Sequence, residues 1–231
     1  MHILGFQKTT LLDYPGHVAA TAFTGGCNFR CPFCHNGDLV LHPRELPSFQ
    51  EDEIFAHLKK RQGILDGVCI TGGEPTLQPD LMDFIKEVRS LGYDIKLDTN
   101  GYQPDVVKEL CAQGLIDYVA MDIKHAPAKY NTICNVPDFQ LSHIMDTVEF
   151  LKSDAVPYEF RTTLIQELHT AADMISIGEW LSGAKAYFLQ AYKDSDAVIQ
   201  RGFHAHDRDT LQQFVELLEP YLPTVQLRGV D

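Results

Sequence analysis

Short apolar runs alternate with longer amphipathic stretches along most of the chain. The short runs have the length and composition of buried strands, whereas the stretches between them repeat their apolar residues at helical spacing. The expected strands are His17–Phe23, Gly67–Thr71, Asp94–Asp98, Tyr118–Asp122, Tyr158–Thr163, Lys185–Leu189 and a last one at Thr224–Leu227. The expected helices are Gln50–Gln62, Pro79–Leu91, Pro104–Gln113, Phe139–Lys152, Ala171–Ser182 and Asp207–Tyr221. Strands that alternate with helices favour parallel βα units and hence an α/β fold.

Proline and glycine support the ends of two of these helices. Pro79 and Pro104 suit the first turn of a helix, where a missing N–H costs nothing. Gly92 and Gly114 suit the position just after a helix. Six βα units are too few to close an eight-stranded barrel. We therefore predict an open, partial (β/α)6 barrel, with residues 1–231 as a single domain.

Polar residues follow five of the expected strands at the point where each strand ends. These clusters are Thr71–Pro75, Asp98–Gly101, Asp122–Lys124, Arg161–Thr163 and Gln190–Tyr192. In parallel α/β folds the carboxyl ends of the strands carry the ligand site. Five polar clusters at the same end of one sheet therefore predict a single functional site.

Charge and hydropathy exclude two classes of partner. The chain has 231 residues and a formal net charge of −13. Affinity for bulk nucleic acid rests on Lys and Arg that neutralise phosphates, so this charge argues against a nucleic-acid partner. No apolar run approaches the roughly 20 residues of a membrane helix. We recognise no targeting segment either, and expect a cytoplasmic protein that does not bind membranes.

The most specific chemistry lies in residues 24–40, a loop after the first expected strand. Cys27, Cys31 and Cys34 have the spacing C-x3-C-x2-C. Three thiolates on one short loop suit a cubane iron–sulfur cluster, and three protein ligands leave one iron open to another ligand. A zinc site is an alternative, because His35 and His42 lie close enough in sequence to add a ligand.

The other three cysteines do not extend this motif. An electron carrier of the ferredoxin type would require a fourth cysteine for its cluster. Cys69, Cys111 and Cys134 each stand alone in an apolar or helical context, which is typical of small buried side chains. Six cysteines in a chain of this length are also too few for a disulfide framework.

The cysteine loop resembles that of the radical S-adenosylmethionine (radical SAM) enzymes. In that family three cysteines hold one [4Fe–4S] cluster, and the amino and carboxylate groups of SAM bind the fourth iron. Phe33 matches the family's residue near the adenine of SAM. A Gly-Gly-Glu-Pro stretch in the family hydrogen-bonds the methionyl amino group, which implies this role for Gly72, Gly73 and Glu74.

Two further strand ends are similar to those of the activases of glycyl radical enzymes. Asp98-Thr99 and Asp122-x-Lys124 match their Asp-Thr and Asp-x-Lys stretches. The resemblance implies that Asp98, Thr99 and Asp122 help to bind a monovalent cation beside SAM. It also implies that Lys124 contacts the carboxylate of SAM. Arg161 is a further candidate for such a contact, although a salt bridge would explain it equally well.

Residues 5–16, 97–101, 118–124 and 226–230 extend the resemblance to most of the chain. Together they are similar to the anaerobic ribonucleoside-triphosphate reductase activating proteins, in their longer form. The resemblance implies that a flavodoxin- or ferredoxin-type donor reduces the cluster, which then cleaves SAM. The resemblance further implies that the resulting 5′-deoxyadenosyl radical abstracts hydrogen from a glycine of the reductase, and we expect no side chain to act as a general acid or base.

Two departures from the activases leave alternatives open. The chain lacks the cysteine-rich, ferredoxin-like insertion of some activases, so we expect one cluster. The sixth strand of formate-lyase activases leads to a histidine near the cofactor, whereas the matching stretch of this chain is Leu189-Gln190-Ala191-Tyr192-Lys193. The alternatives are an activase of another glycyl radical enzyme such as pyruvate formate-lyase, and a radical SAM enzyme that acts on a small molecule or peptide. An iron–sulfur electron carrier or a zinc-binding adaptor would belong to a different class.

Overall fold

The structure, a computed structural model, describes residues 1–230 and contains one eight-stranded sheet. The strands are β1 (Ile3–Thr10), β2 (Ala19–Thr24), β3 (Gly67–Gly72), β4 (Asp94–Thr99), β5 (Tyr118–Asp122), β6 (Tyr158–Leu164), β7 (Tyr187–Ala191) and β8 (Val225–Arg228). They lie side by side in the order of the chain. β1 is antiparallel to β2, and every later pair is parallel.

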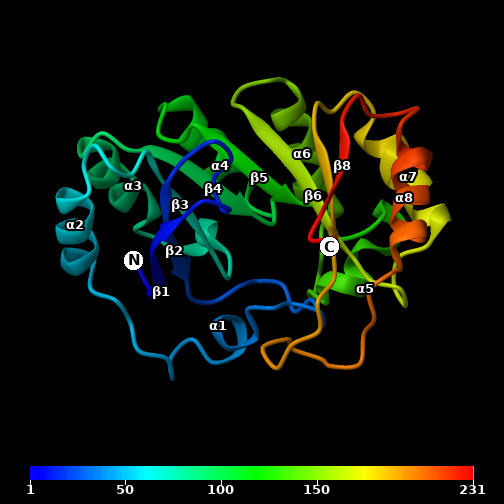
Figure 1. The fold of residues 1–231 in the computed structure, drawn as a ribbon, viewed down its shortest axis with the longest axis horizontal. Helices are drawn as coiled ribbons and strands as arrows, with labels where there is room; N and C mark the ends of the chain where they lie inside the picture. The colour runs from blue at the N-terminus through cyan, green and yellow to red at the C-terminus, as the bar shows by residue number, and fades with distance from the viewer. Residues whose placement is uncertain (231) are drawn as a thin grey trace.

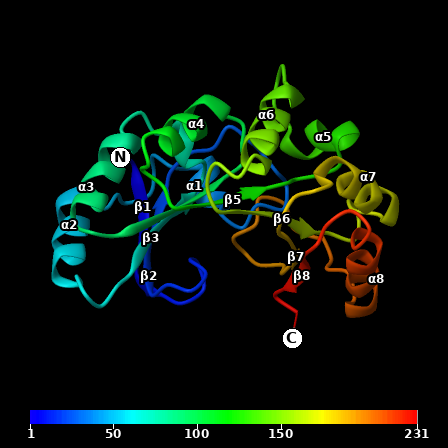
Figure 2. The ribbon, with the colours of Figure 1, turned by 90° about the horizontal axis from the view of Figure 1, so that it is seen from above.

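The connections between the parallel strands are helical. The α-helices are α1 (Gly37–Leu41), α2 (Glu51–Lys60), α3 (Leu81–Ser90), α4 (Pro104–Ala112), α5 (Tyr130–Cys134), α6 (Leu141–Lys152), α7 (Ala171–Leu181) and α8 (Arg208–Leu218). Short 3-10 turns precede α3 and α5 at Pro75–Leu77 and Pro127–Lys129. The longer helices cover the convex side of the curved sheet, and α1 and α5 lie near one end of the strands (Figures 1 and 2).

This architecture confirms the predicted partial α/β barrel. Each strand from β2 to β7 is followed by a helix, which gives six βα units, and β8 closes the series. β1 and β8 form the two ends of the strand order, so the sheet is open. The expected strands overlap β2 to β8 within a few residues, because buried apolar runs define strands well.

The core lies between the sheet and the helices. Ile70, Leu97 and Phe160 from the strands are fully buried, as are Ile85 and Val148 from the helices. Burial of each such side chain contributes roughly 1.5–3 kcal/mol relative to exposure. This packing fixes the positions of the strands, and thereby the positions of the polar residues at their carboxyl ends.

The structure adds a strand that the apolar pattern did not indicate. β1 buries Ile3 and Leu4, but Gln7, Lys8 and Thr9 are exposed, so only its first residues have the apolar character of a strand. It pairs with one neighbour only and is an edge strand. The cysteine loop therefore follows the second strand of the chain, not the first as expected.

The helix ends agree with the sequence at three of the four marked positions. Pro104 is the first residue of α4, and Gly92 and Gly114 follow α3 and α4 with φ values of +86° and +62°. Pro79, however, lies before α3, which begins at Leu81. Within residues 1–230, no helix has both the length and the apolar character needed to cross a bilayer.

Candidate active site

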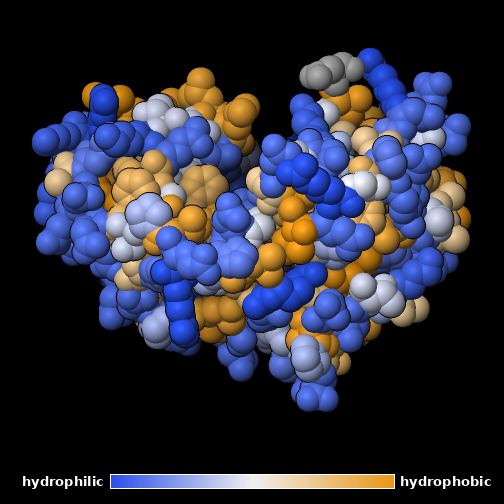
Figure 3. All heavy atoms as spheres, turned by 90° about the horizontal axis from the view of Figure 1, so that it is seen from below, coloured by the Kyte–Doolittle hydropathy of each residue, from blue (hydrophilic) through white to orange (hydrophobic). Residues whose placement is uncertain are grey.

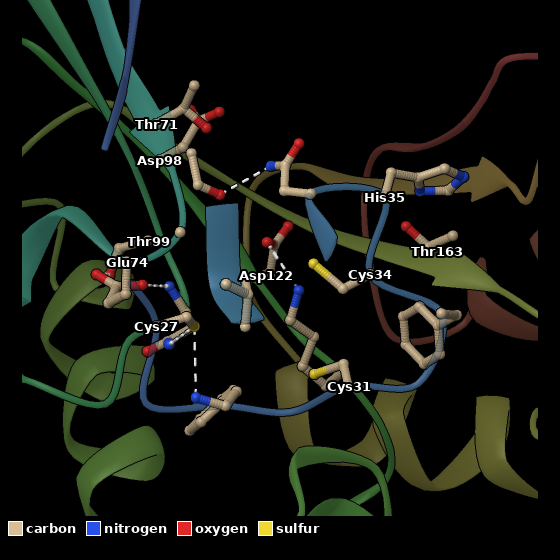
Figure 4. A pocket seen from close by; sticks show the side chains of 18 of the residues that line it. Cys27, Cys31, Cys34, His35, Thr71, Glu74, Asp98, Thr99, Asp122 and Thr163 are labelled. Atoms are coloured by element: carbon tan, nitrogen blue, oxygen red, sulfur yellow. Dashed lines mark hydrogen bonds and ion pairs between the residues drawn. The ribbon is translucent and has the colours of Figure 1, made fainter. Parts of the chain in front are cut away.

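The carboxyl ends of the strands surround a cavity of about 480 Å³. Its lining includes every predicted site residue, drawn from the cysteine loop and from the ends of β3, β4, β5 and β6. These residues are Cys27, Cys31, Phe33, Cys34, Gly72, Gly73, Glu74, Asp98, Thr99, Asp122, Lys124 and Arg161. Gln190 of β7 also lines the cavity, so the five polar clusters meet as expected (Figure 4).

The three cysteines of the loop lie around this cavity with hydrogen-bond donors behind the first of them (Figure 4). The backbone N–H of Phe29 lies 3.3 Å from Cys27 Sγ, and Asn100 Nδ2 lies 3.8 Å from it. The amide of Asn28 is buried, with its Nδ2 atom lacking a hydrogen-bond acceptor. Soft sulfur donors supported by N–H groups are what an iron–sulfur cluster requires, so the residues fit such a cluster.

The thiols differ in how readily they lose a proton. Burial raises the pKa of Cys27 to about 12 and also raises that of Cys34. A hydrogen bond from Cys134 lowers the pKa of Cys31. Because iron binds thiolates, cluster binding must displace the protons of Cys27 and Cys34.

The three remaining cysteines occupy different settings. Cys69 and Cys134 are buried, as expected, and Cys111 is half-buried on α4. Cys134 does not stand alone, however, because its thiol donates to Cys31 and its carbonyl accepts from the Arg30 N–H at 2.8 Å. The sequence gave no signal for this contact, since α5 is separated from the loop by about a hundred residues.

The two glycines at the end of β3 allow it to lie against the cysteine loop. Gly72 has a φ of +113°, and a Cβ there would lie 2.3 Å from the Thr24 N atom. A Cβ on Gly73 would lie 1.9 Å from the Gly26 carbonyl oxygen. The Glu74 N–H donates to that same oxygen at 2.8 Å. No larger residue fits, so this packing explains both glycines, and their contact with SAM remains a prediction.

Glu74 organises the site from beneath. Its carboxylate is almost completely buried and accepts hydrogen bonds from Thr76, Thr99 and Asn100. The Thr99 hydroxyl lies 2.8 Å from Oε1, and the Asn100 N–H lies 2.7 Å from Oε2. Burial raises the pKa of Glu74, although these donors oppose the effect. Glu74 thus joins the ends of β3 and β4 through hydrogen bonds.

A chain of ion pairs crosses the floor of the cavity. Arg161 donates to Asp98 through Nη2 at 3.1 Å and to Asp122 through Nε at 2.5 Å. Lys124 Nζ donates to Asp122 Oδ2 at 2.9 Å. Burial alone would raise the pKa of Asp122, but Arg161 and Lys124 hold it well below its usual value. Arg161 therefore forms the salt bridge that its sequence position allowed, and it does so inside the site.

Two stacked histidines fix the loops after β5 and β6. The rings of His125 and His169 lie 4.8 Å apart. His169 Nδ1 accepts from the Ile165 N–H, and its Nε2 donates to the carbonyl of Lys124, each at 3.1 Å. His169 also meets the ring of Phe33 edge-on at 6.3 Å. The neutral ring of His169 therefore positions both Lys124 and Phe33, a role that the sequence did not reveal.

The segment after β7 holds the other side of the cysteine loop. The N–H groups of Ile199 and Gln200 donate to the carbonyls of Cys34 and Pro32 at 3.2 and 2.8 Å. The Gly37 N–H donates to the carbonyl of Ala197 at 3.0 Å. These contacts are made by backbone groups, so they require no particular side chain and could not be predicted from the sequence.

The fold and the site define a cluster-binding enzyme of the α/β class. The sequence model of the radical SAM superfamily matches residues 21–169, well over half of the chain. The protein belongs to that superfamily, whose cofactors are a [4Fe–4S] cluster and SAM.

Individual relatives agree with this assignment. A Methanocaldococcus jannaschii protein, provisionally named a glycyl-radical enzyme activating enzyme, is 28% identical over 99% of this chain and 96% of its own length. A pyruvate formate-lyase-activating enzyme from Clostridium pasteurianum is 34% identical over 53% of this chain and 52% of its own. The crystal structure of Streptococcus suis SuiB bound to S-adenosylmethionine has a TM-score of 0.70 at 14% identity. That match covers 89% of this chain and 49% of SuiB, and shows a shared fold.

Replacement of a loop cysteine tests the cluster. Cys27→Ala, Cys31→Ala and Cys34→Ala should each abolish the binding of about four irons and four sulfides after anaerobic reconstitution, because each removes one thiolate ligand. Cys111→Ala on α4 is the matched control and should retain full iron content. Iron and sulfide analysis together with the electron paramagnetic resonance (EPR) spectrum of the reduced protein measure the result. Stoichiometric zinc without iron in the wild-type protein would contradict the assignment of the loop.

The buried histidine predicts a dependence of stability on pH. Burial lowers the pKa of His169 to about 4. Between pH 6.5 and 4 the unfolded chain therefore binds the proton more tightly than the folded protein does. The free energy of unfolding should fall by up to about 3 kcal/mol as the pH drops through this window. Urea unfolding at several pH values measures the slope.

Two variants isolate the contribution of His169 to this slope. His169→Gln removes one titrating ring and should reduce the slope, at the cost of lower stability at pH 7. The stacked His125, whose pKa burial also lowers, would keep its own contribution to the slope. His42→Gln, at an exposed position, is the control and should keep the slope of the wild type. An unchanged slope in His169→Gln would mean that another group causes the loss at low pH.

Proposed function

We propose that the protein is a radical SAM activase that generates a glycyl radical in an anaerobic ribonucleoside-triphosphate reductase. The observation that carries the proposal is the meeting of the three loop thiols and the five strand-end clusters at one cavity of an open barrel. The match to the M. jannaschii protein over nearly the whole length of both chains supports the activase class.

Different residues of the cavity would bind the cluster and SAM. Cys27, Cys31 and Cys34 would hold the cluster. When bound, the cluster and SAM together supply an organic radical that removes a hydrogen atom from carbon. Lys124 has ammonium donors to spare after its bond to Asp122, and it would orient the carboxylate of SAM. Phe33, held by His169, would pack near the adenine.

The chain's own groups position these cofactors and transfer no proton. Glu74 lines the cavity and accepts hydrogen bonds from Thr76, Thr99 and Asn100. With Gly72 and Gly73 it would hold the methionyl amino group of SAM. Asp98 and Asp122 remain ionised because of their cationic neighbours. No side chain of the cavity is therefore assigned as a general acid or base.

The route to the cavity suits a polypeptide substrate. A second hollow lies at the β7–β8 edge of the sheet and shares His35, Thr163 and Gln190 with the cavity. Lys193 and Gly229 line its outer part. Figure 3 shows a notch in the surface of the molecule between two lobes. Thr163 and Gln190 offer hydrogen-bonding groups that match the backbone of an extended loop, such as one that carries a glycine.

The choice of the reductase as partner rests on the segments that resemble its activating proteins. Gln190 and Tyr192 stand where a formate-lyase activase would have its histidine, and Gln190 lines the cavity. A flavodoxin- or ferredoxin-type protein is the proposed electron donor. Location in the cytoplasm remains a prediction.

Glycyl radical formation tests the function directly. The reduced protein, SAM and the reductase, mixed without oxygen, should give a doublet EPR signal. Deuteration of the glycine α-carbon should collapse the doublet and place deuterium in 5′-deoxyadenosine. The reason is that the hydrogen passes directly from the α-carbon to the 5′-carbon of the deoxyadenosyl radical. Cys111→Ala should behave as the wild type, whereas Cys34→Ala should be silent. A doublet in pyruvate formate-lyase but not in the reductase would reassign the partner. Deuterium that comes from a small molecule instead would contradict the activase function.

A further inference from the structure

A lysine lies fully buried beneath the proposed cofactor site. Lys96 stands in the middle of β4 and is 2% exposed. Lysine is almost never buried to this extent unless its charge is paired. Its ammonium group contacts Asp98 Oδ1 and lies 3.8 Å from Cys69 Sγ. Lys96 and Asp98 are two residues apart on one strand, so both side chains point to the same face, with the lysine one step further from the strand end.

The contacts of Asp98 and Asp122 leave no carboxylate oxygen without a cationic partner. Asp98 Oδ1 accepts from Lys96, and Oδ2 accepts from Arg161 at 3.1 Å. Asp122 Oδ1 accepts from Arg161 at 2.5 Å, and Oδ2 accepts from Lys124 at 2.9 Å. These are the oxygens that the resemblance to the activases assigns to a monovalent cation.

The third expected ligand of that cation is also engaged. The Thr99 hydroxyl donates to Glu74 at 2.8 Å and accepts from the Gly101 N–H at 3.1 Å. A sodium or potassium ion would have to displace one of three cationic side chains or join them. The expected cation therefore does not fit these residues as they are arranged.

The charges of the five paired side chains explain why a further cation does not fit. Lys96, Arg161 and Lys124 carry three positive charges, and Asp98 and Asp122 carry two negative ones. Among these five groups one positive charge is therefore in excess, and the carboxylate of SAM would neutralise it. Asp13 and Glu74 also line the cavity, but they form no ion pair with these three cations. Burial alone would raise the pKa of Asp98, but Arg161 and Lys96 hold it below its usual value. A further cation would leave a buried excess of positive charge, which is unfavourable in a medium of low dielectric constant.

We propose that the ammonium group of Lys96 takes the place of a monovalent cation at Asp98, so that this protein binds SAM without sodium or potassium. The inference rests on the proposed SAM site, but not on the identity of the reductase. Lys96 is a positioning residue: it fixes Asp98, which fixes Arg161 and through it Asp122 and Lys124. A covalently attached charge stays at Asp98 whatever the concentration of free sodium or potassium.

The dependence of SAM binding on cations tests this inference. Anaerobically reconstituted protein is titrated with SAM in a calorimeter in choline, sodium or potassium chloride at one ionic strength. Wild-type affinity should vary by less than about twofold among the three salts, because the site already holds its cation. Lys96→Ala should weaken binding by about tenfold in choline chloride, because Asp98 keeps Arg161 at Oδ2 but its buried Oδ1 loses its cationic partner. Sodium, potassium or methylammonium should restore most of this loss, since each supplies a cation to the vacated space.

Lys96→Met is the matched variant, because it removes the charge but fills the space. It should bind SAM as weakly as Lys96→Ala does in choline, and no cation should restore its affinity. Lys59→Ala, on the exposed face of α2, is the control and should behave as the wild type. The thermal midpoints of all four proteins without SAM, in the same salts, show whether each variant folds and whether a cation binds in the absence of the cofactor.

Three results would overturn the inference. A wild-type affinity for SAM that rises about tenfold in sodium or potassium would show that a cation binds despite Lys96. Wild-type affinity in Lys96→Met would show that the charge is not required. Weak binding by Lys96→Ala that no cation restores would reduce Lys96 to a structural role. If Lys96→Ala does not fold, the wild-type affinities in the three salts and the affinity of Lys96→Met still test whether the charge of Lys96 replaces the cation. None of these measurements depends on glycyl radical formation, so they separate this inference from the choice of partner.

Discussion

A chain of ion pairs joins three neighbouring strands at their carboxyl ends, and the geometry of the cavity depends on it. The pair of Lys96 with Asp98 is buried, and the pair of Lys124 with Asp122 is partly exposed. Arg161 of β6 bridges Asp98 of β4 and Asp122 of β5, and a lysine completes each end of the chain. Removal of one member of a buried pair, such as Lys96 with Asp98, leaves its partner charged in a medium of low dielectric constant, which typically costs about 3–5 kcal/mol. Solvent screens the partly exposed pair of Lys124 with Asp122, so its loss costs less. The pairs therefore form a rigid floor, on which a cofactor finds its contacts already arranged.

The cysteine loop has little regular structure of its own and is held from two sides. The Gly72–Glu74 turn packs against its beginning, and the segment after β7 hydrogen-bonds to its middle at Pro32 and Cys34. Glu74 connects this packing to β4 through Thr99 and Asn100. The thiols are thus placed by contacts between segments that are far apart in the sequence.

The sequence predicted the parts of this arrangement that leave a local pattern. β2 to β8 are rich in apolar residues and could be located from the sequence, although β4, β6 and β8 alternate apolar with polar residues. The three cysteines stand in a recognisable spacing. The polar strand ends could be brought together because parallel strands share an edge. β1 was not predicted, because it is an edge strand in which Gln7, Lys8 and Thr9 are exposed and few residues are apolar. Backbone contacts, such as those of Ile199 and Gln200, depend on no particular side chain and leave no pattern at all.

Lys96 shows a different limit of inference from the sequence. β4 alternates apolar Ile95 and Leu97 with polar Lys96 and Asp98. From the sequence alone, a lysine at such a position is more often a surface charge on the exposed face. Only the register of β4 between β3 and β5 turns it toward Asp98 and away from solvent. A resemblance that assigns roles to Asp98 and Asp122 cannot anticipate that a neighbouring side chain already occupies their oxygens. The residues that match a family therefore define where a ligand site lies, while the residues that surround them decide which ligands that site still has room to bind.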